Sequence, residues 1–208
     1  MSDLSDISKA LNFGKDFLLR SSVKDAELSA ELLLSDVANL NRQSLYSHFE
    51  DGLSLFQQKQ YEEYITRRAK DEPVQYILQY TYFRGLKIYV EPGVLIPRPE
   101  TEQLVETAIK YLTKDDCKIL EIGTGSGCIA CSLANEYKNA KIVATDISDR
   151  AISCAKKNVA QYNFEDKIEL VQCNIADEVH DNDYDLLISN PPYVPTEVYE
   201  NLDSEVKD

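Results

Sequence analysis

The order of elements after residue 117 constrains the fold of this chain more than any other sequence feature. Short runs of apolar and β-branched residues, typical of buried strands, alternate there with longer stretches of helical periodicity. The predicted elements are a strand at 118–122, a helix at 128–137, a strand at 141–145, a helix at 149–162, and strands at 168–172 and 184–189. Such alternation implies a parallel sheet with helices on both faces, so we expect a Rossmann-like α/β domain.

Four residues come just after the predicted strands, and their positions predict where a ligand binds. These residues are Gly123, Asp146, Asn174 and Asn190. In sheets of this class, ligands bind at the carboxyl ends of the strands. We therefore expect the four residues to converge on one edge of the sheet.

A glycine-rich loop joins the first predicted strand to the first predicted helix. It reads Glu121-Ile122-Gly123-Thr124-Gly125-Ser126-Gly127. Glycines let the backbone approach a ligand, and the helix N-terminus that follows favours an anion, either a pyrophosphate or the carboxylate of S-adenosylmethionine. The spacing GxGxG differs from the dinucleotide fingerprint GxGxxG, and the absence of Gly-Lys-Ser/Thr disfavours an ATP-type phosphate loop. A tight turn with no ligand is the alternative.

Asp146 ends the second predicted strand, about 20 residues beyond the glycines. An acidic side chain at this place can accept hydrogen bonds from both hydroxyls of a ribose. It can also cap the following helix, and that role is compatible with ligand binding.

The segment Asn190-Pro191-Pro192-Tyr193 follows the last predicted strand and indicates the chemistry. Two prolines fix two φ angles and remove two backbone donors, so the turn is stiff. It offers acceptors, namely the Asn190 side-chain oxygen and the carbonyls of Asn190 and Pro191. A planar NH₂ group needs such acceptors, and the Tyr193 ring supplies a flat surface beside them. The segment therefore predicts chemistry on an amide or amino nitrogen.

The chain before the α/β domain is expected to contain two further parts. Residues 1–72 have helical periodicity and predict a small helical domain. Residues 73–95 predict a linker with a β-hairpin, because residues 80–90 are rich in aromatic and β-branched side chains around Gly85. The α/β domain then spans residues 96–208.

Charge and composition limit the partners. The chain has 36 acidic and 22 basic residues and a formal net charge of −14, which argues against sequence-general binding of DNA or RNA, since phosphate contacts need a basic surface. No stretch approaches the ~20 apolar residues of a membrane helix, and the acidic N-terminus has no apolar signal core. A cytoplasmic protein that does not bind membranes is therefore expected. The five cysteines fit reduced thiols, and neither they nor the two histidines predict a metal site.

These motifs carry a family resemblance. The glycine loop followed by residues 190–193 resembles the class I methyltransferases that modify exocyclic amino or amide nitrogens. Three further stretches, at 72–77 (EPVQYI), 83–86 (FRGL) and 93–102 (GVLIPRPETE), resemble the bacterial glutamine methyltransferases of peptide chain release factors. The last stretch is the most family-specific, and the resemblance covers most of the chain, including the helical domain.

The resemblance implies an activity and a set of site residues. The activity is transfer of a methyl group from S-adenosylmethionine to the side-chain amide nitrogen (N5) of the glutamine in a Gly-Gly-Gln loop of release factors, which modulates translation termination and leaves S-adenosylhomocysteine. The glutamine amide would be held by Asn190, Pro191, Pro192 and Tyr193. The cofactor would be held by Glu121, Gly123, Thr124, Gly125, Ser126, Gly127, Asp146, Asn174, Ile175 and Asn190. A release factor is the expected partner, residues 1–72 the expected docking domain, and a monomer the expected state.

Three features depart from the family pattern. Gln79 stands where the family usually has glycine, and Cys173-Asn174-Ile175 stands where it commonly has a Ser-Asp-aromatic run beside the adenine. Asn174 can still hydrogen-bond the adenine amino edge, and Ile175 offers apolar packing in place of ring stacking. The chain also ends at Asp208, soon after the fourth predicted strand, so a C-terminally truncated member with an incomplete sheet is expected.

Other functions stay open at this point. An N6-adenine or N4-cytosine nucleic-acid methyltransferase uses the same turn on an exocyclic NH₂, although the net charge of −14 counts against it. A glutamine methyltransferase of a ribosomal protein shares the Asn-Pro-Pro-Tyr turn but resembles residues 93–102 less. A non-catalytic scaffold or an inactive fragment is a third alternative, and a nicotinamide oxidoreductase is disfavoured by the glycine spacing.

Overall fold

The computed structural model describes residues 3–181 and 183–191 and divides the chain into two compact units, Met1–Leu78 and Gln79–Asp208. Pro192 and Tyr193, which the sequence placed in the substrate site, lie outside the described residues.

The first unit is helical. Its elements are α1 (Ile7–Arg20), α2 (Ala26–Ala38), α3 (Arg42–Leu45), α4 (Leu55–Arg68) and α5 (Val74–Leu78). The helices enclose an apolar core that includes the fully buried Leu18, Leu33 and Ile65. Helix α5 packs on α2 and α4, so the unit extends to Leu78.

Arg68 connects the end of α4 to the start of α2. Its side chain is 5 % exposed, and a buried guanidinium needs partners for its charge and its N–H groups. It donates to Ser29 Oγ at 3.1 Å, to Asp25 Oδ1 at 2.7 Å and to the Glu72 carbonyl at 3.4 Å. These contacts fix the two helix ends to each other.

The second unit begins with the expected hairpin, β1 (Tyr80–Phe83) paired antiparallel with β2 (Leu86–Tyr89). Its two turn residues, Arg84 and Gly85, have φ values of +47° and +78°. Positive φ at both central positions defines a type I′ turn, whose twist matches that of the strands.

Gln79, just before β1, has a backbone conformation that residues with a side chain adopt only at a cost. Its φ is +62°, and its carbonyl accepts a hydrogen bond from the Val90 N–H at 3.2 Å. Glycine adopts positive φ freely, which is a physical reason why the family that this chain resembles usually has glycine at this position.

Gln79→Gly is therefore expected to raise the free energy of unfolding by roughly 0.5–1 kcal/mol, because the strain of a side chain at positive φ exceeds the entropic cost of glycine. Urea denaturation measures the difference. Gln103→Gly is the matched control: Gln103 is exposed within α6 (Pro99–Tyr111), and its replacement should lower stability by about 1 kcal/mol. Equal losses in the two variants would contradict the explanation.

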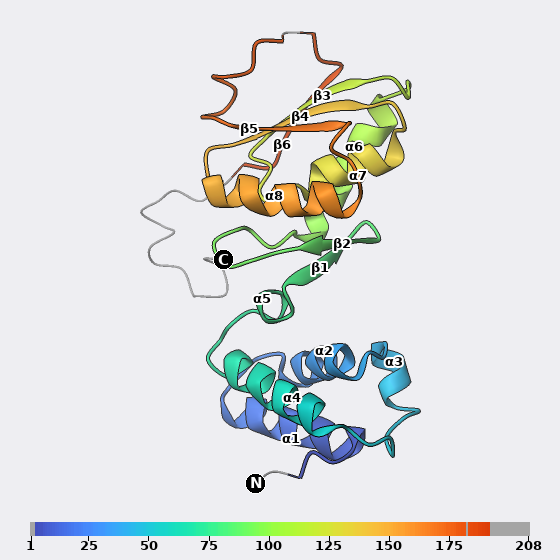
Figure 1. The fold of residues 1–208 in the computed structure, drawn as a ribbon, viewed down its shortest axis with the longest axis vertical. Coiled ribbons are helices and arrows are strands. Elements are labelled where there is room, and N and C mark those ends of the chain that lie inside the picture. The colour runs from blue at the N-terminus through green and yellow to red at the C-terminus, as the bar shows by residue number, and fades with distance from the viewer. Residues whose placement is uncertain (1–2, 182, 192–208) are drawn as a thin grey trace. The chain divides into compact units, whose positions relative to one another are not determined.

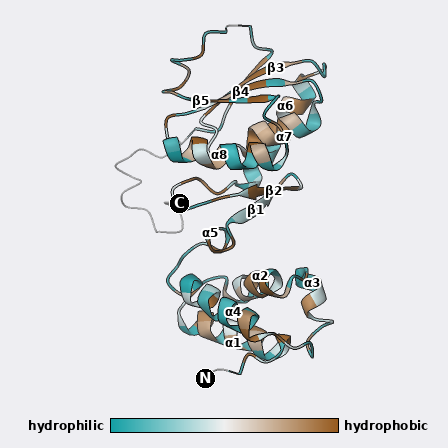
Figure 2. Ribbon diagram, in the orientation of Figure 1, coloured by the Kyte–Doolittle hydropathy of each residue, from teal (hydrophilic) through white to brown (hydrophobic). Residues whose placement is uncertain are grey.

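The second unit contains a four-stranded parallel sheet in the order β5-β4-β3-β6. The strands are β3 (Lys118–Ile122), β4 (Lys141–Asp146), β5 (Ile168–Gln172) and β6 (Leu186–Ser189), and the helices that connect them are α7 (Cys128–Glu136) and α8 (Asp149–Gln161). Helices α7 and α8 pack on β4 and β5, and the buried residues of these four elements are mostly hydrophobic. Figure 2 shows the hydrophobic stretches of α7 and of the strands in brown. The predicted Rossmann-like architecture is confirmed for these elements.

The helices differ from the expectation in one respect. Figure 1 shows α6, α7 and α8 on the same side of the sheet, and within the described residues no helix joins β5 to β6. The two connections from β3 to β4 and from β4 to β5 step across the sheet in the same direction. Right-handed crossovers in one direction place their helices on one face.

The strand order puts a topological switch point between β3 and β6. The chain first moves outward from β3 to β4 and β5, and then returns to the other side of β3. Ligands of open parallel sheets bind outside the carboxyl ends of the strands at such a point.

In the part of the chain that the structure describes, no helix is long and apolar enough to cross a membrane.

Candidate functional site

The glycine loop after β3 has the backbone conformation that only glycine adopts without strain. The φ values of Gly123, Gly125 and Gly127 are +75°, +56° and +78°. A Cβ atom built at Gly123 or Gly125 would meet no atom within 4 Å, whereas one at Gly127 would lie 3.1 Å from the Ala155 Cβ. Gly127 therefore allows α7 and α8 to pack, and Gly123 and Gly125 leave open space in front of the main chain.

Asp146, at the end of β4, lies beside this loop. Its Oδ2 accepts from the Gly125 N–H at 2.9 Å, and its Oδ1 accepts from the Ser148 N–H at 2.9 Å. Both backbone donors fix the orientation of the carboxylate. Each oxygen keeps further lone pairs with which it can accept hydrogen bonds from a ligand.

Glu121, the fourth residue of β3, places a buried carboxyl group under the loop. The residue is 0 % exposed, and its Oε2 accepts from the Thr124 hydroxyl at 3.0 Å. Its Oε1 is buried and has no hydrogen-bond partner among the described residues. The pKa of Glu121 is raised to about 8, mainly by burial of the carboxyl group; the Thr124 hydroxyl and the Ala130 N–H lower it, and the charge of Asp146 adds to the rise.

The raised pKa predicts how stability depends on pH. Below the ordinary glutamate pKa of 4.5 the Glu121 carboxyl is protonated in both the folded and the unfolded chain, and between 4.5 and about 8 only the folded chain keeps the proton. Deprotonation of the unfolded chain therefore lowers the free energy of unfolding as pH rises through this window. In Glu121→Gln this loss is absent, so the stability of the variant relative to wild type is expected to increase from pH 4.5 to about 8.

Urea denaturation at several pH values checks this prediction. Glu165→Gln, at an exposed glutamate in the loop before β5, controls for the general effect of removing an acidic group. If the stability difference between Glu121→Gln and wild type stayed constant with pH, the Glu121 carboxyl would not hold its proton in the folded chain.

Asn190 follows β6, so it lies across the switch point from the glycine loop. The pairing of β3 with β6 places Ile122 opposite Ser189, and the Ser189 hydroxyl donates to the Ile122 carbonyl at 2.8 Å. The Asn190 side-chain Nδ2 donates to Thr101 Oγ1 of α6 at 3.1 Å. The structure thus brings Asn190 and the glycine loop to neighbouring strand ends.

Asn174 and Ile175 follow β5 and are exposed. Ile175 has a φ of +54°, a strained conformation for a β-branched residue, and its carbonyl accepts from the Thr145 hydroxyl at 2.5 Å. Ile147, next to Asp146, is 68 % exposed, and Ile175 is 61 % exposed. Two exposed isoleucines at this edge offer apolar surface, and Ile147 was not among the site residues predicted from the sequence.

Asn158, a fully buried asparagine of α8, is a second residue of this region that the sequence did not predict. Its Nδ2 donates to the Ser126 carbonyl of the glycine loop at 2.8 Å and to the Tyr89 carbonyl at 2.9 Å, and its Oδ1 accepts from the Tyr89 N–H at 2.7 Å. Asn158 therefore joins the glycine loop to the hairpin. The sequence does contain a signal for this role, because Asn158 lies on the same helix face as the apolar residues Cys154, Ala155 and Val159. A polar residue on a buried face usually has a hydrogen-bond partner.

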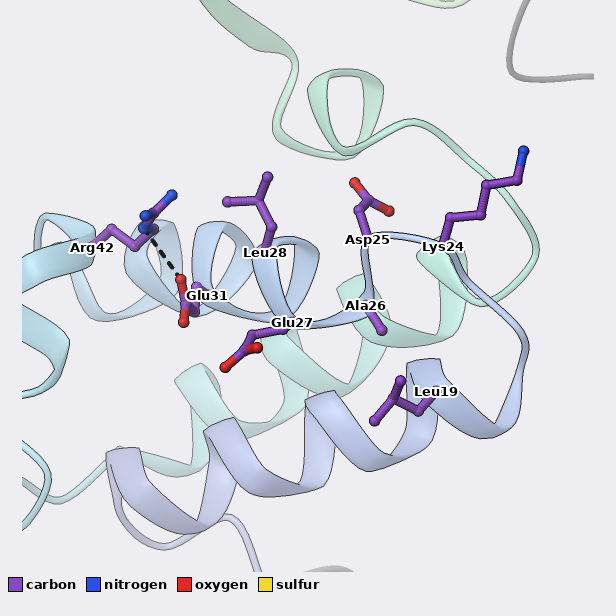
Figure 3. A pocket seen from close by; sticks show the side chains of 8 residues that line it. All are labelled: Leu19, Lys24, Asp25, Ala26, Glu27, Leu28, Glu31 and Arg42. Carbon is purple, nitrogen blue, oxygen red and sulfur yellow. Dashed lines mark ion pairs between the residues drawn. The ribbon is translucent and has the colours of Figure 1, made fainter.

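Other features of the described residues do not add to this site. The free cysteines at 117, 128, 131, 154 and 173 are buried, and no group of His, Cys, Asp or Glu in the described part could hold a metal ion. A groove in the first unit, shown in Figure 3, is lined by Leu19, Lys24, Asp25, Ala26, Glu27, Leu28, Glu31 and Arg42. Arg42 pairs with Glu31 at 3.2 Å, and the groove contains none of the predicted site residues.

Comparison with known proteins relates this geometry to a family. The model of the PrmC N-terminal domain matches residues 9–78, and the model of the methyltransferase small domain matches residues 100–202. A release factor glutamine methyltransferase of Geobacter sulfurreducens is 37 % identical over 97 % of this chain and 70 % of its own length. The chain belongs to the release factor glutamine methyltransferase family. Another member of this family, from Koribacter versatilis, is 36 % identical over 97 % of this chain and 72 % of its own length.

Solved structures overlap with a smaller part of the chain. The ribosomal protein L11 methylase of Lactobacillus delbrueckii subsp. bulgaricus is 28 % identical and covers 50 % of this chain, which in turn covers 52 % of it. The TM-score is 0.43.

Proposed function

We propose that this chain transfers a methyl group from S-adenosylmethionine to the side-chain amide nitrogen of a release-factor glutamine. The observation that carries the proposal is the position of three features at the ends of neighbouring strands: the open glycine backbone after β3, Asp146 after β4 and Asn190 after β6. Membership of the release factor glutamine methyltransferase family supports it.

The residues of this edge fit S-adenosylmethionine. The open space at Gly123 and Gly125 suits a close approach to the main chain, and Asp146 has lone pairs for ribose hydroxyls. The buried Oε1 of Glu121, which has no hydrogen-bond partner within residues 3–181 and 183–191, suits a donor such as an ammonium group. The cofactor supplies an electrophilic sulfonium methyl group when bound. Thr124, Ser126 and Gly127 would shape the loop, and Asn174, Ile175 and Ile147 would border the adenine.

The acceptors of the turn after β6 would bind the glutamine amide. In an amide the nitrogen lone pair is delocalised into the carbonyl, so the nitrogen is a weak nucleophile. The Asn190 side-chain oxygen and the Pro191 carbonyl would accept hydrogen bonds from the two N–H groups of the substrate amide. They would favour a geometry in which the nitrogen lone pair points at the methyl group. Positioning of this kind can supply about 7–11 kcal/mol of the barrier. The nitrogen would gain the methyl group as the methyl–sulfur bond breaks and S-adenosylhomocysteine leaves, and it would lose one proton to solvent.

The remaining assignments rest on sequence. Pro192 and Tyr193 would complete the substrate site, with the tyrosine ring against the amide plane. Residues 1–72 would dock the release factor, since the family model of the N-terminal domain matches there. A protein target rather than DNA is supported by the net charge of −14. The proposal includes a single chain acting in the cytoplasm.

Mass spectrometry of a purified release factor tests the proposal. After incubation with this chain and S-adenosylmethionine, the peptide with the Gly-Gly-Gln sequence should gain the mass of one methyl group in place of a hydrogen. A release factor with the glutamine replaced by glutamate is the control and should stay unmodified. Methylated DNA with an unmodified release factor would overturn the proposal in favour of a nucleic-acid methyltransferase.

A further inference from the structure

Thr101 lies in the first turn of α6 and contacts Asn190 although the two residues are 89 positions apart in the chain. Thr101 is 8 % exposed, and its Oγ1 accepts from the Asn190 Nδ2 at 3.1 Å. Pro99 begins the helix, so the position of the Thr101 side chain is set by a regular helical turn rather than by a loop.

In this structure the contact with Thr101 leaves the Oδ1 end of the Asn190 amide available to a substrate. Thr101 Oγ1 accepts a hydrogen bond from Nδ2 of Asn190, and Oδ1 of Asn190 accepts no hydrogen bond from the described residues. An NH₂ group of a glutamine carries two donors and needs an acceptor. If the Asn190 amide were turned round, its own NH₂ would face the substrate NH₂, and two donors would meet.

We propose that Thr101 is a positioning residue, which holds the Asn190 amide so that Oδ1 faces the glutamine nitrogen. The inference rests on the proposed function and adds a residue outside the turn to the substrate side of the site. A hydrogen bond that Oδ1 accepts from substrate also polarises the Asn190 amide and strengthens its donation to Thr101. Thr101 thus acts through Asn190 and does not touch the reacting atoms.

Thr101→Val and Thr101→Ser separate the hydroxyl from the shape of the side chain. Valine keeps the branched shape and removes the acceptor, so kcat for glutamine methylation should fall by about 10–100-fold, the effect of removing a partner that orients a directly contacting side chain. The Kd for S-adenosylmethionine should change less than about twofold, since no cofactor contact is removed. Thr101→Ser keeps the hydroxyl and should retain kcat within a few fold. Thr107→Val, an exposed threonine of the same helix, should behave as wild type.

A readout without turnover distinguishes failure of this inference from failure of the proposed function. The side-chain amide resonances of Asn190 in ¹⁵N–¹H NMR spectra should shift in Thr101→Val and in a second hydroxyl-free variant, Thr101→Ala, but not in Thr101→Ser. If wild type methylates no release factor, the proposed function fails, and the NMR comparison still tests the contact. Equal kcat values and unchanged Asn190 resonances in Thr101→Val and Thr101→Ser would overturn the inference.

Discussion

Asn190→Ala is expected to lower kcat for release-factor methylation by at least about 10²–10³-fold, the effect of removing one transition-state hydrogen-bond partner from a preorganised site. The Asn190 side chain is the acceptor that the structure holds at the end of β6, with its Nδ2 already bound to Thr101. Its oxygen would interact more strongly as the substrate nitrogen gains positive charge. The loss should therefore appear in kcat and not in substrate binding alone.

Cofactor binding provides the contrast for this variant. Asp146, the glycine loop and Glu121 are unchanged in Asn190→Ala, so the Kd for S-adenosylmethionine, measured by calorimetry, should stay within a few fold of wild type. Asn139→Ala is the matched control, because Asn139 is exposed just before β4, at the opposite end of that strand from Asp146. Near-normal turnover by Asn190→Ala would show that the turn after β6 does not hold the substrate amide.

Among the substitutions proposed for this chain, Asn158→Leu is expected to lower the free energy of unfolding the most. Leucine has a similar size but cannot form the three hydrogen bonds that Asn158 makes with the main chain of Tyr89 and Ser126. Main-chain groups left buried without a partner cost about 1–3 kcal/mol each. We therefore expect the free energy of unfolding to fall by roughly 2–4 kcal/mol in urea denaturation, allowing for partial rescue by water. Cofactor affinity should also fall, because Ser126 belongs to the glycine loop.

Gln161→Leu is the matched control on the same helix. The Gln161 amide donates one hydrogen bond, to the Lys87 carbonyl of β2 at 2.8 Å, and it is exposed. Water can replace this bond, so the loss should stay below about 1 kcal/mol and cofactor affinity should not change. Similar losses in both variants would show that the buried contact of Asn158 has no special role in connecting the hairpin to the glycine loop.

Local sequence determined most of the elements. The predicted bounds of the strands at 118–122 and 168–172 agree with β3 and β5, and the hairpin at 80–90 contains β1 and β2. Apolar and β-branched runs bounded by turn residues carry this information within a few residues of each strand. The positions of Gly123 and Asp146 at strand ends followed from the same runs.

Contacts between distant residues could not be predicted in this way. Asn158 lies 69 residues from Tyr89, and Thr101 lies 89 residues from Asn190. The local sequence patterns of α8 and α6 do not predict these partners, because each partner depends on the strand end or loop against which the helix packs. The common face of α7 and α8 likewise follows from the direction of the crossovers, which only the strand order reveals.

The sequence by itself determined the class of fold, the glycine loop with its acidic partner, and the acceptor-rich turn, because each of these is encoded in a short contiguous segment. The tertiary structure decided how those segments are held. It buried the Glu121 carboxyl under the loop, fixed the loop through Asn158, and oriented the Asn190 amide through Thr101. These features arise where buried polar groups from separate segments must find partners on packing, and no single segment specifies that outcome.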